Sequence, residues 1–274
     1  MKLIGIGDNV VDYYQDQGLM YPGGNALNVA VASKRNGASA CAYLGIVGDD
    51  AEAEHVVKCM GEEGIDFSRI RRAYGLSGKA VVALNEEGDR IFVGTNRGIR
   101  LQSLLMLKLT QDDLDYINEY DVVHTSVNSD IEHELSRLAH KPLSFDFSTT
   151  KRWNKAYLQL VCPYLTYAFF SGSDMSHSEI SSLFEEVHQL GVQVVGVTRG
   201  AEPAMFSKDG IICSQPHMTG NVIDTMGAGD SFIGGFLAHY HEYRDMQAAL
   251  IQASRSAAVT CGHYGAFGYG KKKQ

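Results

Sequence analysis

The chain has 274 residues, of which 45% are hydrophobic, and its formal net charge is −8 at pH 7. A chain of this length and composition can bury a large core, which excludes a disordered or fibrous protein. The acidic excess argues against nucleic-acid binding through a broad basic face, because neutralising phosphates requires clustered Lys and Arg. The basic run at residues 271–273 reads as a solvated tail.

The five cysteines are widely separated and include no Cys-x-x-Cys pair. This pattern argues against a disulfide framework or a zinc site and favours buried thiols in a reducing compartment. The N-terminal apolar segment is too short for a signal peptide, and no apolar stretch approaches the roughly 20 residues that span a bilayer. We therefore expect a cytoplasmic protein that binds neither membrane nor nucleic acid.

Short apolar runs alternate with helix-like segments along most of the chain. Buried strands are predicted at residues 3–6, 40–44, 121–124, 143–145, 167–170 and 193–197. Helices are predicted at residues 25–36, 51–63, 178–190, 228–242 and 246–262. This alternation is typical of an α/β fold, in which helices cover both faces of a mostly parallel sheet.

Residues 70–100 break the alternation. Apolar runs at 80–84 and 90–93 flank a glycine-containing turn at 85–88, which predicts a β-hairpin. With a short N-terminal segment near residues 13–21, the hairpin would form a small separate β layer. Since no repeat or low-complexity linker is present, residues 1–274 are expected to form one main domain with this β appendage.

Residues 224–230 read Asp-Thr-Met-Gly-Ala-Gly-Asp and open a predicted helix. The loop Gly227-Ala228-Gly229 leaves backbone N–H groups at the positive end of the helix dipole, where they can hold a phosphate. Asp230, in the first turn, can accept a proton from a hydroxyl beside that phosphate. For a bare Gly-x-Gly-Asp, a tight turn followed by a helix cap would be the favoured explanation.

A second glycine-rich motif lies near the N-terminus, where residues 22–30 read Pro-Gly-Gly-Asn-Ala-Leu-Asn-Val-Ala. Gly24 permits close approach of the backbone to a polyhydroxy ligand. Asn25 and Asn28 are three residues apart on the following helix and can present their amides to sugar hydroxyls. The alternative is a helix N-terminus with capping amides.

Together these two motifs resemble the signatures of the ribokinase-like (PfkB) carbohydrate kinases, and the resemblance extends over residues 2–267. It implies a central, mostly parallel sheet flanked by helices, with a β lid that closes over the sugar. It also implies that Asp230 is the catalytic base and that the glycine loop before it is the anion hole. Lid closure would exclude water and so protect ATP from hydrolysis.

The same resemblance suggests further substrate-binding residues. Asp12 matches a position where a carboxylate accepts hydrogen bonds from substrate hydroxyls. Asp8 is either a second such group or a loop-capping acid. Arg97, just after the hairpin, is either a contact for a polar or anionic substrate group or an ordinary surface arginine.

Two segments resemble the family's nucleotide-binding elements. Residues 197–200 match a strand-end Thr-x-Gly beside the ATP phosphates and ribose, although Pro203 replaces the next glycine of that pattern. Residues 257–266 match the segment that closes around adenine. The resemblance implies nucleotide-binding roles for Thr198, Gly200, Thr225, Gly227, Gly229 and Ala258.

Magnesium is expected, because ATP brings the ion with it and Mg²⁺ commonly keeps most of its waters. Many relatives carry an Asn-x-x-Glu motif at the end of a middle strand, whereas residues 171–174 read Ser-Gly-Ser-Asp here. Asp174 could act through water, but no direct protein ligand is assigned.

Within this family the sequence most resembles the fructoselysine 6-kinases. The stretches that carry this likeness are residues 6–12, 23–30, 121–124, 145–148 and 222–232. The resemblance implies an ATP-dependent kinase acting on the primary 6-hydroxyl of a fructosamine, with fructoselysine the leading candidate. The alternatives are a fructokinase, ribokinase or nucleoside kinase, and a non-catalytic sugar or nucleotide sensor. An exposed lid strand is a ready pairing edge, so a homodimer through the lid is a further expectation.

Overall fold

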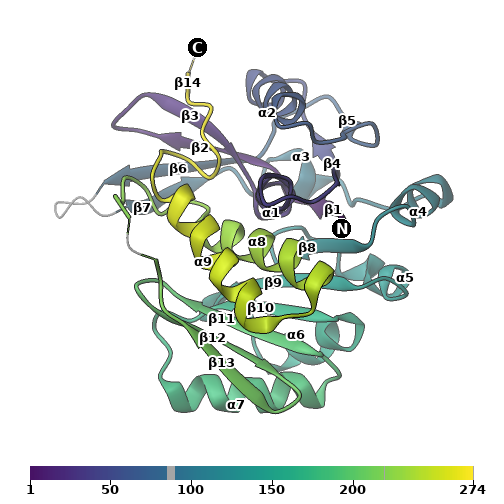
Figure 1. Ribbon diagram of the computed structural model, residues 1–274. Coiled ribbons are helices and arrows are strands. Elements are labelled where there is room, and N and C mark those ends of the chain that lie inside the picture. Colours follow the sequence, from purple (N-terminus) through teal and green to yellow (C-terminus); the bar gives the residue numbers. More distant parts are fainter. Residues whose placement is uncertain (85–89, 219, 274) are drawn as a thin grey trace.

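The computed structural model describes residues 1–84, 90–218 and 220–273 (Figure 1). In this part of the chain the larger sheet has the strand order β13-β12-β11-β10-β9-β8-β1-β4-β5. Its strands are β1 (Lys2–Gly7), β4 (Ala40–Val47), β5 (Arg71–Arg72), β8 (Val122–Ser126), β9 (Leu143–Thr149), β10 (Tyr167–Ser171), β11 (Val194–Arg199), β12 (Glu202–Lys208) and β13 (Ile211–Gln215). Neighbours from β5 to β11 run parallel, and β12 and β13 extend the sheet antiparallel.

Helices pack against both faces of this sheet. One face is covered by α1 (Asn25–Arg35), α2 (Ala51–Glu62), α8 (Ala228–Tyr243) and α9 (Met246–Thr260). The other is covered by α4 (Gln111–Ile117), α5 (Leu135–Leu138), α6 (Lys155–Val161) and α7 (His177–Gln189). The remaining short elements are α3 (Leu101–Leu104), η1 (Glu132–Glu134), η2 (Thr150–Arg152) and η3 (Cys162–Tyr164). The predicted α/β fold class is confirmed.

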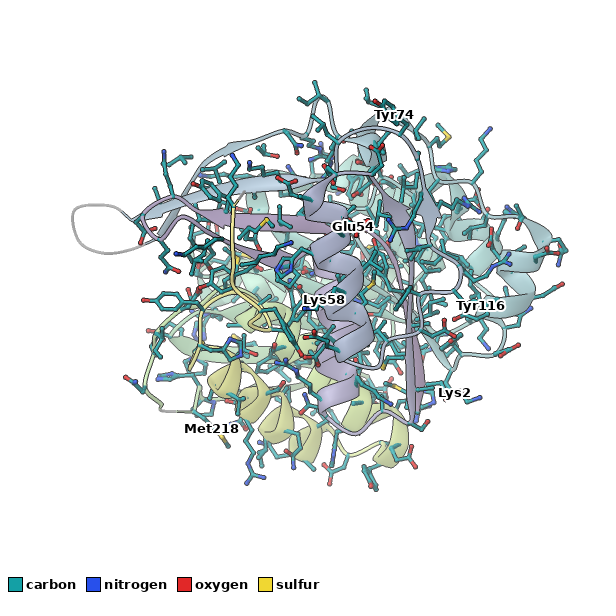
Figure 2. The ribbon with its side chains drawn as sticks, turned by 90° about the horizontal axis from the view of Figure 1, so that it is seen from above. Lys2, Glu54, Lys58, Tyr74, Tyr116 and Met218 are labelled. Carbon is teal, nitrogen blue, oxygen red and sulfur yellow. The ribbon has the colours of Figure 1, made fainter. Side chains whose placement is uncertain are left out.

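The side chains of β1 point alternately to the two faces of the larger sheet and so contribute to both helical layers. Leu3 packs among the side chains of α1 and α8, whereas Ile4 packs on the opposite face with α4 and α5. Successive side chains of a strand point to opposite faces, so a strand buried on both sides is apolar throughout. On the outer surface of α2, Glu54 and Lys58 are exposed (Figure 2).

The six predicted strands and five predicted helices are all present, and their ends differ from the predictions by a few residues. Helix starts have identifiable causes: the Asp50 carboxylate accepts a hydrogen bond from the Ala53 N–H at 2.9 Å and caps α2. A capping box between Ser176 and Glu179 begins α7. The antiparallel pair β12–β13 was not predicted, because its strands lack a clear apolar periodicity.

A smaller sheet lies beside the N-terminal half of the molecule (upper left in Figure 1). Its order is β14-β3-β2-β6-β7. The strands are β2 (Val10–Tyr14), β3 (Leu19–Gly23), β6 (Lys79–Leu84), β7 (Arg90–Thr95) and β14 (Lys271–Lys272). β6 and β7 pair antiparallel, as the predicted hairpin requires, and its turn at residues 85–88 lies outside the described residues.

Two details of the small sheet differ from the sequence prediction. Residues 71–72 form β5, which pairs with β4 of the larger sheet, so the hairpin of the small sheet begins at Lys79 instead of near residue 70. Residues 271–272 form β14 on β3 and are not simply a solvated tail. Backbone pairing needs no apolar side chains, so composition alone did not reveal this strand. Among the described helices, none combines the length and apolar character needed to cross a membrane.

Candidate active site

The two predicted motifs meet at the carboxyl ends of the parallel strands, where ligands bind in open α/β folds. Asp230, in the first turn of α8, accepts hydrogen bonds from both asparagines of α1. The Asn25 Nδ2 donates to Asp230 Oδ1, and the Asn28 Nδ2 donates to Asp230 Oδ2, both at 2.6 Å. The Asn25 Nδ2 also donates to the Oδ2 of Asp146, which lies within β9, at 2.7 Å. Each oxygen of the expected base is thus held by one amide.

His124, on β8, orients the Asn25 amide. Its Nε2 lies 2.9 Å from the Asn25 Oδ1, and its Nδ1 lies 2.8 Å from the Ser144 Oγ. Burial lowers the pKa of His124 to about 3, so the imidazole is neutral. With the proton on Nε2, His124 donates to the amide oxygen and accepts from Ser144. This leaves the Asn25 N–H groups directed at the two carboxylates.

Three carboxyl groups crowd this site. Burial raises the pKa of Asp230 to about 6, and the charge of Asp8 adds to this, while the amides of Asn28 and Asn25 oppose it. Burial, followed by the charge of Asp230, raises the pKa values of Asp12 and Asp146 to about 7. A carboxyl group with a pKa near 6 is mostly ionised at pH 7 and still basic enough to take a proton.

Asp8 is buried at the N-terminus of α1. Its carboxylate accepts hydrogen bonds from the backbone N–H groups of Asn25 at 2.7 Å and Ala26 at 3.2 Å. The hydroxyls of Ser126 and Ser129 donate to it at 3.0 and 2.9 Å. Of the two readings that the sequence left open, this geometry matches the capping acid. A carboxylate at this end of a helix also complements the helix dipole.

The glycine loop before α8 adopts the backbone conformation that the anion-hole prediction needs. Gly227 has φ 73°, and a Cβ there would lie 2.5 Å from the Ala266 side chain, so only glycine fits. Among the described residues, no side-chain hydrogen bond caps the N-terminus of α8. A Cβ on Gly229 would meet nothing within 4 Å, so this residue borders open space. The first turn of α8 is therefore accessible to an anion.

The buried side chain of Asp224 holds the glycine loop in place. This side chain is fully buried and accepts hydrogen bonds from the Tyr14 hydroxyl at 2.5 Å and the Gly265 N–H at 2.9 Å. It also accepts one from the Met226 N–H at 2.5 Å. The first Asp of the motif thus ties the glycine loop to the small sheet and the C-terminal segment, a role that the sequence analysis did not assign.

A cavity of about 550 Å³ opens beside the N-terminus of α8. Five of the six predicted nucleotide-binding residues line it: Thr198, Gly200, Thr225, Gly229 and Ala258. The sixth, Gly227, packs against Ala266 instead. Met218, which also lines the cavity, lies beside α9 (Figure 2), where its N–H donates to the Ser254 Oγ at 3.0 Å. The volume is in the usual range for a small-molecule site.

A sequence profile of the pfkB family of carbohydrate kinases matches residues 1–269. The chain belongs to this family. It is therefore a carbohydrate kinase, an enzyme that transfers a phosphoryl group to an alcohol. Solved structures with the same fold include a fructokinase with bound ATP from Xylella fastidiosa, with TM-score 0.80 and 20% identity, covering 97% of this chain and 94% of that one. A ribokinase II from E. coli in complex with ATP and Mg²⁺ gives TM-score 0.81 at 20% identity, with the same coverage.

Two curated relatives of the kinase match nearly its whole length. The fructosamine kinase FrlD of Bacillus subtilis (strain 168) is 50% identical over 271 residues, covering 98% of this chain and 94% of the relative. The fructoselysine 6-kinase of Escherichia coli (strain K12) is 30% identical over 264 residues, covering 96% and 98%. The family recognised from the two sequence motifs is confirmed.

Two expected substrate-binding residues of the kinase, Asp12 and Asn28, are buried near Asp230. Asp12 lies on β2 and is 4% exposed. The Asn28 Oδ1 is buried and has no hydrogen-bond partner among the described residues. An unpaired buried oxygen is costly, so it fits a position that a substrate hydroxyl occupies. Gly24 has φ 107°, and a Cβ there would lie 2.6 Å from the Asn9 Cα, so the chain packs too closely for a side chain.

For magnesium the kinase offers little of its own. Within the described ranges, no group of three or more His, Cys, Asp and Glu side chains is arranged to hold a metal ion. Asp174 is exposed and accepts a hydrogen bond from the Thr150 Oγ1 at 3.1 Å. This arrangement fits an ion carried in by the nucleotide, since Mg²⁺ is often held by substrate phosphates and water.

Sequence reasoning missed Asp146 and His124. Both stand in stretches that we identified by resemblance, but no local pattern indicated a polar role for either. A signal was present, because each follows apolar residues at the carboxyl end of a predicted parallel strand.

Proposed function

We propose that this kinase transfers the γ-phosphoryl group of ATP to the primary 6-hydroxyl of a fructosamine, with fructoselysine as the leading acceptor. The observation that carries the proposal is the 50% identity, over 98% of the chain, to the fructosamine kinase of Bacillus subtilis. The 30% identity to a fructoselysine 6-kinase points to the same substrate class.

In the proposed reaction Asp230 is the general base. The hydroxyl proton moves to a carboxylate oxygen of Asp230, the hydroxyl oxygen attacks the γ-phosphorus in line, and the bond to ADP breaks. Each Asp230 oxygen accepts one amide hydrogen bond, which fixes the carboxylate and leaves lone-pair capacity for the proton. The backbone N–H groups at the start of α8 stabilise charge on the transferred group.

The sugar would contact Asp12, Asp146 and the unpaired Asn28 Oδ1, while Gly24 lets the backbone approach it. We propose that Asn25 acts through Asp230 instead of on the sugar, because its oxygen and nitrogen are already engaged within the protein. Asp8 acts indirectly too, by fixing the N-terminus of α1.

ATP would occupy the cavity lined by Thr198, Gly200, Thr225, Gly229 and Ala258, with its terminal phosphate at the start of α8. Mg²⁺ bound to the nucleotide would neutralise charge on the phosphates. The cavity and the glycine loop adjoin each other, so a nucleotide placed there would direct its γ-phosphate toward Asp230.

The test is ADP release by the purified protein with Mg-ATP, comparing fructoselysine, fructose, ribose, adenosine and no acceptor at equal concentration. We expect preference for fructoselysine, and product analysis should place the phosphate on the 6-hydroxyl. The Asp230→Asn variant should lose a factor of about 10² to 10⁴ in turnover, the usual contribution of a general base. Preference for fructose, ribose or adenosine would refute the substrate assignment and leave the kinase chemistry in place.

We also propose a homodimer that pairs through the lid. Strand β7 is an edge of the small sheet, and Phe92 and Val93 on it are 68% and 50% exposed. Exposed apolar edge strands favour pairing with a second chain. Sedimentation equilibrium should give a dimer for the native protein and a monomer for Phe92→Glu, and a monomeric native protein would refute this.

A further inference from the structure

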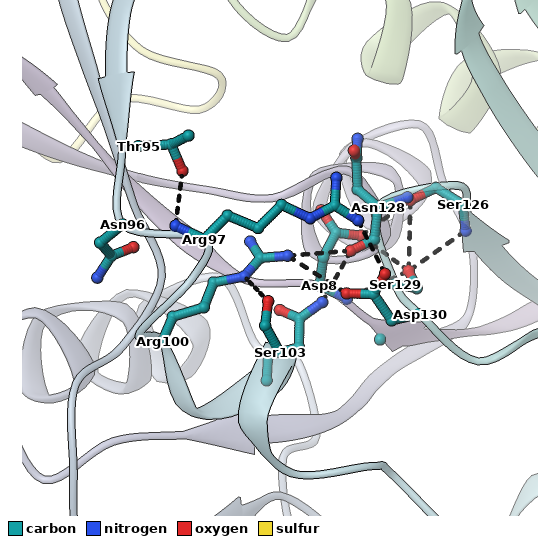
Figure 3. A network of polar contacts seen from close by, with 12 residues as sticks. Asp8, Thr95, Asn96, Arg97, Arg100, Ser103, Ser126, Asn128, Ser129 and Asp130 are labelled. Atoms are coloured by element: carbon teal, nitrogen blue, oxygen red, sulfur yellow. Dashed lines mark hydrogen bonds and ion pairs between the residues drawn. The ribbon is translucent and has the colours of Figure 1, made fainter. Parts of the chain in front are cut away.

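Three arginines converge on one loop at the outer side of the candidate site. Arg97 lies just after β7 of the small sheet, Arg100 lies just before α3, and Arg152 is the last residue of η2, which follows β9. Figure 3 shows Arg97 and Arg100 reaching the loop after β8 that carries Asn128 and Asp130.

Contacts in this cluster assign a different role to each guanidinium. Arg100 is 5% exposed and donates to the Ser103 Oγ at 3.0 Å and the Asn128 carbonyl at 3.4 Å, so it is structural. Arg97 is more accessible, and one of its Nη atoms donates to Asp130 Oδ1 at 2.8 Å. The Arg152 Nη2 donates to the Asn128 Oδ1 at 2.5 Å.

Arg97 and Arg152 retain donors for a ligand. A guanidinium has five N–H donors. In the part of the chain that the structure describes, the side chain of Arg97 makes a single hydrogen bond, and so does that of Arg152. The half-buried Arg97 and the exposed Arg152 have unused donors and are suited to bind a carboxylate, which accepts paired N–H groups.

The charge of the cluster contrasts with that of its surroundings. The two oxygens of Asp130 lie 2.8 and 3.6 Å from Arg97 and Arg100, and the carboxylate of Asp8 also attracts Arg100. The three guanidiniums of the cluster thus outnumber these two carboxylates. This surplus of positive charge stands out in a chain of net charge −8. The neighbouring sugar site holds the acids Asp12, Asp146 and Asp230. A ligand that spans both regions would place its hydroxyls among the acids and a negative group among the arginines.

Both loops of the cluster connect directly to the walls of the sugar site. The Val127 N–H donates to the Asp146 carbonyl at 2.9 Å, so the loop bearing Asn128 starts beside that acid. On the side of the small sheet, the Asn96 Nδ2 donates to the Ser77 carbonyl and the Lys79 N–H donates to the Asn96 Oδ1, both at 2.7 Å. Lys79 pairs with β2, the strand that carries Asp12. The cluster therefore lies at the outer end of the same site.

We propose that Arg97 and Arg152 form a subsite for the carboxylate of the amino acid attached to the sugar. Asp130, which also pairs with Arg100, holds Arg97 in place. The inference rests on the proposed fructosamine specificity and deepens it, because it assigns recognition of the non-sugar part of the acceptor. The subsite distinguishes an amino-acid adduct from free fructose, which has no carboxylate.

Three acceptors of matched length test this subsite: fructoselysine, the fructose adduct of 1,5-diaminopentane, and the fructose adduct of pentylamine. The first two differ only in the carboxylate, and the third also lacks the distal amine. We expect kcat/KM for fructoselysine to exceed that for the diaminopentane adduct by about tenfold or more, the usual effect of a charge-assisted hydrogen bond. The two adducts without a carboxylate should be similar to each other.

The variants are Arg97→Gln and Arg152→Gln, with Arg72→Gln as control. Arg72 lies on β5, away from the cluster, and forms a surface ion pair with Glu54 of α2. Each test variant should raise KM for fructoselysine about tenfold, leave kcat nearly unchanged, and not affect the diaminopentane adduct. The control should change neither acceptor.

The outcomes separate this proposal from the one on which it rests. Equal kcat/KM for fructoselysine and the diaminopentane adduct would refute the subsite and leave the fructosamine kinase intact. Equal losses on both acceptors in Arg97→Gln would show that the Arg97–Asp130 pair only fastens the lid. No activity on any fructose adduct would refute the proposed function itself.

Discussion

Replacing Asn25 with alanine tests whether this residue tunes the base. In the free enzyme the Asn25 amide donates to Asp230 at 2.6 Å and holds the pKa of Asp230 below the value that burial alone would impose. A hydrogen bond to a charged group is worth about 1.5–3 kcal/mol, and one pKa unit corresponds to about 1.4 kcal/mol. Because the site is partly open to solvent, we take the lower end and expect the pKa of Asp230 to rise by about one unit.

The sign of the effect follows from which form of Asp230 is active. Only the ionised carboxylate accepts a proton, so activity falls as pH drops through its pKa, which is about 6 in the native enzyme. With a pKa near 7, the ionised fraction at pH 6 falls from about one half to about one tenth. We therefore expect kcat/KM at pH 6 to fall about fivefold from this cause alone, with little such loss at pH 8.

The assay is the pH dependence of kcat/KM for the sugar, because that parameter reports groups of the free enzyme. Asn36→Ala is the matched control: it removes an asparagine from the other end of α1, where the amide bonds the Ala32 carbonyl and Ser256. For Asn36→Ala, kcat/KM should fall with decreasing pH at the same pH as in the native enzyme. If Asn25→Ala lowered activity equally at every pH, Asn25 would be a substrate contact or a purely structural residue, and the tuning argument would fail.

The remaining predictions concern the loop, the helix cap and the cavity. Gly227→Ala should lower stability by about 1–3 kcal/mol in urea unfolding and reduce turnover, because φ is 73° and the new Cβ would meet Ala266; a variant with native stability would contradict this. Asp8→Ala should lower stability by about 1–3 kcal/mol, since it leaves buried donors of α1 unpaired, and unchanged unfolding would exclude the capping role. Ala258→Trp should raise KM for ATP with little change in KM for the sugar, because Ala258 lines the cavity beside α8 in which we place ATP. Equal increases in KM for ATP and KM for the sugar would mean that ATP does not bind in this cavity.

The glycine loop could be predicted from sequence because its chemistry is local. A left-handed residue, an uncapped helix start and an acid in the first turn occupy seven consecutive residues, from Asp224 to Asp230. The conformation of Gly227 follows from its lack of a Cβ, which no distant residue has to supply. The positions of strands and helices could be predicted for a similar reason, because buried residues recur with a period of two in strands and near 3.6 in helices.

The arrangement around Asn25 could not be predicted in this way. Its amide lies between Asp146 of β9, Asp230 of α8 and His124 of β8, which the register of separate strands brings together. In the sequence, His124 follows two valines in a predicted buried strand, a pattern that a satisfied core histidine gives equally well. The roles proposed for Asn25 and Asp8 differ from the expected ones for this reason: motif resemblance locates a residue, but only the fold decides which partners already occupy its hydrogen-bonding groups.

The distribution of charge suggests why the site needs this internal bonding. Asp12, Asp146 and Asp230 each have a raised pKa because burial and mutual repulsion oppose ionisation. Without the amides of Asn25 and Asn28, Asp230 would hold its proton more tightly than a base at neutral pH should. Asn28 donates to Asp230 and Asn25 donates to both Asp230 and Asp146, so Asp230 receives two amide hydrogen bonds and Asp146 one. Burial, followed by the charge of Asp230, keeps the pKa values of Asp12 and Asp146 at about 7, and a protonated carboxyl group there can donate a hydrogen bond to a sugar oxygen.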